Sequence, residues 1–239
     1  LSHKGSPWVE DIRRRIQGKY ADSGDRFFVA YAAAEPIAHV WYTVSATDGR
    51  LGLLGHVYTR PDQRHRGIAS RLMEAAMADF LDRGGVVMQL FASTACTVPF
   101  YEKLGYENLY SNQALHETDW YMRYPVGAQA TLNDWFAPGR CHIRPIAPGD
   151  LPKYCLLYNL EYSTRLKDWA QEIGLGLEAE FAFINSIDRQ ARGEGVCRVL
   201  EGGETIVGIA SLTKSGFAHQ SHVAAIDCYV HPEFQGKTK

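Results

Sequence analysis

Residues 57–72 constrain this chain most, because they spell a strand, a short basic turn and the start of a helix in direct succession. Gly67 stands at the junction, where the absence of a side chain lets the backbone approach a ligand closely. The first turn of a helix leaves several amide N–H groups without intrahelical partners, and the helix dipole makes that end positive. With Arg60, Arg64 and Arg66 nearby, these donors predict an anion site suited to a pyrophosphate.

The composition argues against a general polyanion-binding surface. The net charge is only −2 over 239 residues, and no nucleic-acid recognition motif is present. No apolar run approaches the roughly 20 residues that span a bilayer, and the amino terminus lacks a signal-peptide core. The five cysteines are scattered singly, which favours a reducing compartment and gives no support to a structural zinc site. We therefore expect a cytoplasmic protein with no nucleic acid, membrane or metal partner.

Apolar periodicity and turn residues divide the chain into two segments joined by a linker. The amino-terminal segment, 1–125, is predicted to contain helices over 8–20, from Gly67 to Gly84 and from Val98 to Gly105, and strands over 27–33, 37–45, 51–59, 86–92, 106–110 and 119–124. A hairpin turn is expected at Glu35-Pro36. Residues 126–140 are rich in Gly, Pro and Ala and are expected to be the linker. The carboxyl-terminal segment, 141–239, is predicted to contain strands over 142–146, 196–200, 205–212 and 223–230, and helices over 151–166 and 177–192.

The end of the chain repeats the basic turn. Residues 59–66, TRPDQRHR, align without a gap onto residues 230–237, VHPEFQGK, and both follow a strand that itself follows a hairpin. A chance match stays open, because a proline and an acidic residue often form a turn after a strand. We favour an internal duplication.

Two motifs give the chain a family resemblance. The first is Arg64-His65-Arg66-Gly67-Ile68-Ala69 after a strand, and the second is Phe100-Tyr101-Glu102-Lys103-Leu104-Gly105-Tyr106 after a helix and a buried strand. In this order they resemble the GCN5-related N-acetyltransferases, the GNAT superfamily. The resemblance implies an α/β fold with a mixed, mostly antiparallel sheet, flanked by helices and splayed where an acyl-CoA lies. It covers residues 26–124 well and residues 141–239 more loosely, as a second, partial GNAT-like unit in a tandem arrangement.

The resemblance also implies where acetyl-CoA, or another acyl-CoA, would bind as cosubstrate. The pantetheine arm would pair with the end of the third strand, and the pyrophosphate would lie on the amides of the basic turn. The implied cofactor-binding residues are Val57, Tyr58, Thr59, Arg64, His65, Arg66, Gly67, Ile68, Ala69 and Thr94. For Arg60, His65 and Arg66, contact with the CoA 3′-phosphate and projection into water remain equally open.

Tyr101 matches the position where many family members place a general acid. A phenol within hydrogen-bond distance could protonate the departing CoA thiolate; the alternative is that Tyr101 only packs beside Phe100. For the general base we single out His56, because imidazole exchanges protons near neutral pH. Strand alternation puts His56 on the face opposite Val57, so a purely structural histidine stays open. His39, Glu117, Asp119 and a water chain are the other candidates.

Three departures from the family pattern matter. Thr94 and Thr97 occupy positions where many members carry Asn and Ala, which puts the contact of Thr94 with the pantetheine arm in question. Thr238 occupies the position of Gly67 in the repeated turn, where a β-branched side chain would crowd a pyrophosphate. The amino-terminal segment lacks the first strand and helix of a full domain, and the carboxyl-terminal segment lacks the later elements. We therefore expect residues 141–239 to be a partial, non-catalytic unit.

The sequence thus predicts an acyl-CoA-dependent N-acyltransferase that transfers acetyl from acetyl-CoA to an amine by direct attack. The acceptor is expected to be a small-molecule or peptide amine. One alternative is a non-catalytic acyl-CoA-binding scaffold or sensor, and another is an S-acyltransferase or decarboxylase acting on a carrier thioester. An incomplete sheet edge would invite pairing with a second copy, as in a homodimer.

Overall fold

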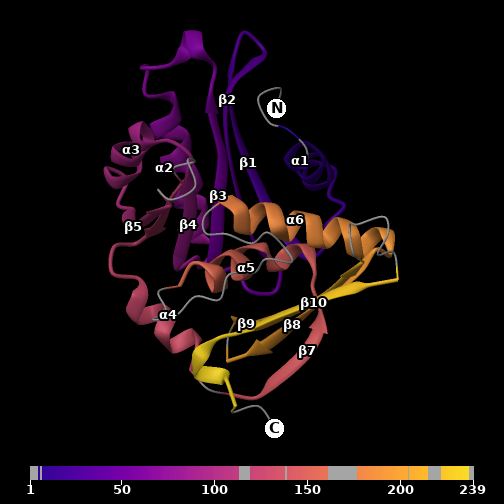
Figure 1. Cartoon of the computed structure of the whole chain (residues 1–239). Helices are drawn as coiled ribbons and strands as arrows, with labels where there is room; N and C mark the ends of the chain where they lie inside the picture. Colours follow the sequence, from indigo (N-terminus) through magenta and orange to yellow (C-terminus); the bar gives the residue numbers. More distant parts are fainter. Residues whose placement is uncertain are drawn as a thin grey trace. The chain divides into compact units, whose positions relative to one another are not determined.

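The computed structural model describes residues 5, 7–112, 119–137, 139–160, 177–203, 205–214 and 222–236. The chain packs as two compact units (Figure 1), which we call the first unit, residues 15–128, and the second unit, residues 1–14 with 129–239. The division falls inside helix α1 (Trp8–Ile16).

Residues 1–14 lie in the second unit because two of their side chains contact helix α6 (Leu177–Arg192). The Trp8 and Phe181 rings lie 5.4 Å apart, and Arg14 forms an ion pair with Asp188. Packing therefore groups the amino terminus differently from the predicted segments 1–125 and 141–239. Those boundaries, taken as limits of family domains, stay a prediction.

The first unit is built on a six-stranded mixed sheet in the order β1-β2-β3-β4-β6-β5. Its strands are β1 (Ser23–Ala32), β2 (Glu35–Ser45), β3 (Leu51–Thr59), β4 (Val87–Ala92), β5 (Glu107–Asn112) and β6 (Asp119–Tyr124). Every neighbouring pair is antiparallel except β3 and β4, which are parallel. The expectation of a mixed, mostly antiparallel sheet is confirmed.

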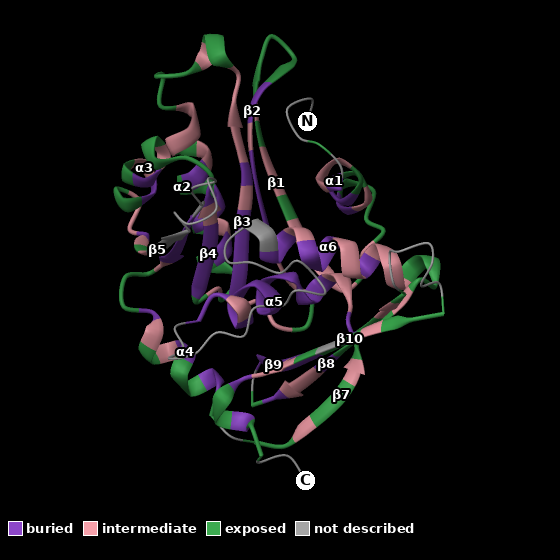
Figure 2. Cartoon of the chain, viewed as in Figure 1, coloured by how far each residue is buried: buried purple, intermediate pink, exposed green. Residues whose placement is uncertain are grey.

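Helix α2 (Ile68–Asp82) covers one face of this sheet and packs on β1, β2 and β3. Strand alternation turns Val40 and Tyr42 toward the helix, where they form a core with Met73, Ala76 and Phe80. The short helix α3 (Val98–Glu102) adds Tyr101 to the same cluster. Figure 2 shows that β3 and β4 are buried along most of their length, as expected of strands near the middle of a covered sheet.

The second unit has a four-stranded antiparallel sheet in the order β10-β9-β8-β7. The strands are β7 (Cys141–Pro145), β8 (Gly195–Gly202), β9 (Thr205–Lys214) and β10 (Ala224–Val230). Helix α5 (Leu151–Tyr158), which follows a short 3-10 helix, η3 (Pro148–Asp150), packs on β9, and α6 packs on β8. Tyr154 of α5 and Phe183 of α6 meet edge to face in a fully buried core.

Several helices, strands and turns begin or end at residues other than those predicted. The first hairpin turns at Ala33-Ala34, both with positive φ, and not at Glu35-Pro36, which lie in β2. Helix α1 ends at Ile16 instead of Tyr20, and α5 ends at Tyr158, with residues 161–166 of that prediction outside the described residues. The range predicted as a linker contains helix α4 (Gln129–Trp135), whose Leu132 is fully buried. None of the described helices is both long and apolar enough to cross a bilayer.

The β8–β9 hairpin repeats the backbone pairing of the β1–β2 hairpin. Each has a two-residue turn, then two residue pairs, then one extra residue on the second strand: Ile37 in β2 and Val207 in β9. In both hairpins, the carbonyl oxygen of that extra residue accepts a hydrogen bond from the backbone N–H of the first residue after the next strand, which is β3 in the first unit and β10 in the second. Arg60 N donates to Ile37 O at 2.8 Å, and His231 N donates to Val207 O at 2.7 Å.

The turn after the third strand is repeated as well. A single 3-10 turn follows β3 as η1 (Pro61–Gln63) and follows β10 as η5 (Pro232–Phe234). The Arg64 side chain donates to the Thr59 carbonyl at 3.1 Å, and the Gln235 side chain donates to the Val230 carbonyl at 3.0 Å. Residues 230–236 therefore reproduce the backbone of residues 59–65, including a positive φ at His65 and at Gly236.

Gly85 gives a direct test of packing between α2 and β4. A Cβ added there would lie 2.4 Å from the Phe80 ring, which is only 1% exposed. We expect Gly85→Ala to lower the free energy of unfolding by about 1–3 kcal/mol, because the ring must leave its packed position. Urea unfolding followed by near-ultraviolet circular dichroism measures the change. Gly49→Ala is the matched control, since a Cβ there meets no atom within 4 Å; equal stability of the two variants would contradict this packing.

Candidate active site

A gap opens in the first unit between the ends of β3 and β4. The two strands pair in parallel from Leu51 with Val87 to Leu54 with Leu90, and β3 then continues to Thr59 with no described strand on that side. Beyond Leu90, β4 pairs only with β6. The predicted splay of the sheet is thus present, and an extended, amide-bearing ligand in the gap would lie beside the backbone of β3, as an added strand does.

The open edge of β3 leads directly into the basic turn. After η1, His65 and Gly67 both have positive φ, 61° and 70°, before α2 begins at Ile68. A turn in which residues of positive φ interrupt residues of negative φ directs successive backbone N–H groups toward a common point and creates a concave anion site. The unpaired N–H groups and the positive dipole end of the 15-residue helix α2 point the same way.

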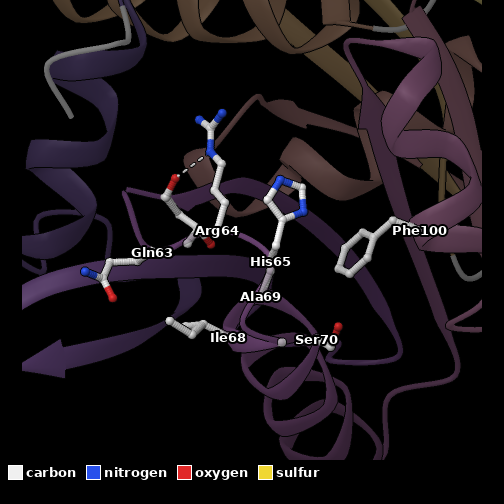
Figure 3. A pocket seen from close by; sticks show the side chains of 9 residues that line it. Gln63, Arg64, His65, Ile68, Ala69, Ser70 and Phe100 are labelled. Atoms are coloured by element: carbon white, nitrogen blue, oxygen red, sulfur yellow. Dashed lines mark hydrogen bonds between the residues drawn. The ribbon is translucent and has the colours of Figure 1, made fainter. Parts of the chain in front are cut away.

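A cavity of about 240 Å³ lies at this turn (Figure 3). Its lining residues are Thr59, Gln63, Arg64, His65, Gly67, Ile68, Ala69, Ser70 and Phe100. The Thr59 hydroxyl is buried there and has no hydrogen-bond partner among the described residues. A Cβ on Gly67 would meet no protein atom within 4 Å, so glycine is needed for its left-handed backbone and leaves the adjoining space open.

The arginines of the turn are not equally available to an anion. Arg60 is bound to Asp62 and Glu35, which raise its pKa through hydrogen bonds and charge. Arg64 donates through Nε to the Thr59 carbonyl, and in Figure 3 its guanidinium points away from the start of α2. Arg66 donates to the Gln63 side chain at 3.1 Å. Each of the three guanidinium groups therefore already has a hydrogen-bond partner within the protein.

A β-bulge interrupts β3 beside the gap. Strand β2 pairs with β3 up to Trp41 with Gly55, and pairing resumes one residue out of register at His39 with Tyr58. His56 and Val57 thus face a single residue of β2, and His56 has a φ of 52°, which is uncommon for a residue with a side chain.

The bulge places its two residues on opposite faces of the sheet. The His56 ring lies against the Trp41 ring, with centroids 5.0 Å apart, and His56 is 9% exposed. Val57 packs on the core beneath α2.

Of the other candidates for the general base, His39 stacks on Tyr58 with ring centroids 5.5 Å apart. Glu117 lies outside the described residues, and Asp119 is the first residue of β6.

Tyr101 lies on the α2 side of the sheet and is 7% exposed. Its ring meets Phe100 and Tyr106 edge to face, with centroids 5.1 and 6.1 Å apart. Burial raises the pKa of the phenol to about 12. Tyr101 therefore stays protonated throughout the neutral range and can donate a proton or a hydrogen bond.

Of the predicted cofactor-binding residues, Thr59, Arg64, His65, Gly67, Ile68 and Ala69 line the cavity, whereas Val57, Tyr58, Arg66 and Thr94 do not. The Thr94 hydroxyl lies 3.4 Å from Cys96 Sγ and from Thr97 Oγ1, and Thr94 does not line the cavity. The sequence reasoning also missed the contribution of Phe100 to the cavity, although its motif position could have revealed it.

Comparison with known proteins identifies this part of the chain. Residues 23–108 match the family described as the acetyltransferase (GNAT) domain. Mycothiol acetyltransferase of Thermobispora bispora is 33% identical over 109 residues, which cover 43% of this chain and 37% of that protein. The matched part thus spans little more than a third of that relative.

Solved structures are similar to about half of the chain. A GNAT-family protein from Desulfovibrio desulfuricans is 17% identical and has a TM-score of 0.43, covering 52% of this chain and 86% of its own. An aminoglycoside 6′-N-acetyltransferase complexed with coenzyme A is 16% identical and has a TM-score of 0.42, covering 51% and 81%.

The raised pKa of Tyr101 predicts a pH dependence. Below pH 10, the ordinary pKa of a tyrosine, the Tyr101 phenol is neutral in both the folded and the unfolded chain. Its contribution to the free energy of unfolding is therefore complete there, and it is lost as the pH rises toward the folded-state pKa of about 12. We expect the Tyr101 ring signal in ¹³C NMR to stay unchanged up to pH 10 and to move only above it. The spectrum of Tyr101→Phe assigns the signal; a shift below pH 9 would contradict the burial of the hydroxyl.

Proposed function

We propose that the first unit, in which residues 23–108 match the acetyltransferase (GNAT) domain, transfers the acetyl group of acetyl-CoA to an amine. Acetyltransferases of this family use acetyl-CoA. One observation carries the proposal: β3 stops pairing with β4 after Leu54 and continues to Thr59, which lines the cavity at the start of α2.

The two ends of acetyl-CoA fit the two parts of this site. The pantetheine arm carries amides that can pair with the backbone of Val57, Tyr58 and Thr59 as an added strand would. The pyrophosphate then meets the amides of residues 64–69 at the start of α2. The buried Thr59 hydroxyl, which has no described partner, offers a further hydrogen bond where the arm joins the phosphates.

The faces of the sheet support direct transfer. A thioester held in the gap has Tyr101 on the α2 side and His56 on the Trp41 side. The amine nitrogen forms a bond to the carbonyl carbon as the carbon–sulfur bond breaks. His56 accepts the proton that the attacking amine loses, and Tyr101 supplies the proton that the sulfur gains, so that amide and free CoA thiol result.

The acceptor is proposed to be a small-molecule amine. The name of the Thermobispora relative, mycothiol acetyltransferase, supports a small-molecule acceptor over a peptide. The aromatic residues Trp41, Tyr42 and Tyr121 are at most 1% exposed, so they belong to the core and give no sign of an aromatic acceptor.

The second unit is proposed to be a partial repeat without catalysis of its own. Its hairpin, third strand and turn share the hydrogen bonds of the first unit. Strand β10, however, pairs with β9 in unbroken register from Ala224 to Val230, so it lacks the bulge that β3 has at His56. Without that bulge, β10 has no counterpart of the position that carries His56.

Calorimetric titration of the whole chain with acetyl-CoA tests the binding site. Gly67→Leu is expected to raise the dissociation constant at least about tenfold, because the side chain fills the space of the pyrophosphate and strains a left-handed residue. Gly84→Leu is the matched control, since Gly84 also has a positive φ, with no atom within 4 Å of an added Cβ, at the other end of α2. Equal loss of affinity in both variants, or no binding by the unaltered chain, would contradict the proposed site.

The role of Tyr101 is tested by steady-state kinetics with an amine panel. We expect Tyr101→Phe to lower kcat about 100-fold or more while the KM for acetyl-CoA changes little, because the acid acts on the leaving sulfur in the transition state. Tyr106→Phe is the control, as Tyr106 is buried in the same cluster and its hydroxyl contacts Met77 Sδ. Binding of acetyl-CoA without turnover of any amine would favour a non-catalytic acyl-CoA-binding scaffold instead.

A further inference from the structure

The indole of Trp41 packs against the bulge in β3 on the sheet face away from α2. Trp41 stands on β2 directly opposite Gly55, and a Cβ added at Gly55 would lie 3.4 Å from the Trp41 ring. The same ring lies 5.0 Å from that of His56, the next residue of β3, which has a positive φ. A side-chain-bearing residue keeps such a backbone conformation only where its surroundings hold it there.

The indole is itself hydrogen-bonded to a carboxylate whose side chain is 9% exposed. Trp41 Nε1 donates a hydrogen bond to Asp25 Oδ1 at 2.8 Å, and Trp41 is only 1% exposed. Asp25 lies on β1, so the bond crosses from the first strand to the second on the face away from α2. An indole N–H can donate only once, and this bond therefore fixes the plane of the ring.

The carboxylate is in turn fixed by an arginine. Arg15 Nη1 lies 3.0 Å from the same Asp25 oxygen, and the Arg15 side chain is fully buried. Its guanidinium also donates to Ser23 Oγ at 3.0 Å and lies 5.2 Å from the centre of the Trp41 ring. A buried ion pair is costly to desolvate, and well-packed apolar side chains would often stabilise a core as well. Its presence beneath the bulge therefore points to orientation more than to stability.

We propose that Asp25 and Trp41, with Arg15, are positioning residues that set the His56 imidazole and the bulge at the splayed end of β3. The inference rests on the proposed function for the role of His56, but the positioning itself does not require acetyl transfer. Asp25 and Trp41 act through His56 and touch neither cosubstrate nor acceptor. The network thus links the far edge of the sheet, β1, to the point where β3 leaves β4.

Two variants test the network without changing the shape of the core greatly. Trp41→Phe keeps an aromatic ring but removes the N–H donor, and Asp25→Asn keeps the acceptor oxygen but removes the charge that pairs with Arg15. Tyr42→Phe is the matched control. Tyr42 is the neighbouring residue on β2, faces α2 and likewise hydrogen-bonds a carboxylate, that of Asp79.

The first readout is the His56 ring signal in ¹H–¹³C NMR of the free protein, assigned with His56→Ala. We expect Trp41→Phe and Asp25→Asn to move this signal and Tyr42→Phe to leave it in place. An unmoved His56 signal in both variants would overturn the proposal, whether or not the chain transfers acetyl groups. If Trp41→Phe does not fold, the near-isosteric Asp25→Asn decides alone.

The second readout is the split between kcat and KM. Where the unaltered chain transfers acetyl groups, we expect both variants to lower kcat by about 10- to 100-fold, with the KM for acetyl-CoA within about twofold. Equal losses in Tyr42→Phe, or a loss confined to KM, would overturn the positioning role. Failure of the unaltered chain to turn over any amine would instead count against the proposed function and leave the NMR test standing.

Discussion

The parallel contact between β3 and β4 is short, and the site depends on where it stops. Four residue pairs, from Leu51–Val87 to Leu54–Leu90, join the two halves of the first sheet. Because the pairing ends there, one sheet provides both a continuous core under α2 and a stretch of β3, from Gly55 to Thr59, with no described strand on its β4 side. An extended ligand that pairs with the backbone of β3 on that side gains affinity from main-chain hydrogen bonds without new side-chain contacts.

The two faces of that sheet are stabilised by different means. The α2 face is an apolar cluster in which Tyr42, Phe80 and Met88 exclude water. On the other face, β1 and β2 carry polar groups: the Ser23 and Thr43 hydroxyls are hydrogen-bonded to each other, and Arg15 donates to both Asp25 and Thr43. Apolar packing is insensitive to direction, whereas hydrogen bonds fix geometry. The bulge at His56 lies where the polar face meets the open edge, so the directional interactions are found where side-chain orientation matters.

The sequence predicted the parts of the fold that local pattern determines. The ranges of β6 and α6 match the predicted 119–124 and 177–192, because apolar periodicity and the flanking turn residues agree. The first hairpin turn was misplaced because proline is a good turn former, whereas pairing between β1 and β2 puts Ala33 and Ala34 into left-handed conformations that alanine does not favour by itself. Helix α4 escaped prediction because its seven residues carry too few apolar positions for a clear period.

Some features of the candidate site could likewise be predicted from local sequence, and others could not. The cavity residues Arg64, His65, Gly67, Ile68 and Ala69 could be named from their motif, since the anion geometry of a turn and helix start is local. The bulge could not, because neither His56 nor Val57 is a residue type that signals a positive φ. The neutralisation of Arg60 by Glu35 was equally hidden, since it joins residues that are adjacent only once β2 and β3 pair.

The repeated turn shows which features of the site belong to the backbone and which to the side chains. Residues 59–65 and 230–236 share their hydrogen bonds and a positive φ, yet His65 occupies in one turn the position of Gly236 in the other. The turn therefore tolerates an imidazole at a position where glycine relieves strain. The two units differ in the strand before the turn. Strand β3 has a bulge whose His56 packs on the Trp41 ring, whereas β10 pairs with β9 in unbroken register. The turn itself is therefore a property of the shared backbone, whereas the chemistry proposed here needs the bulge that β3 has and β10 lacks.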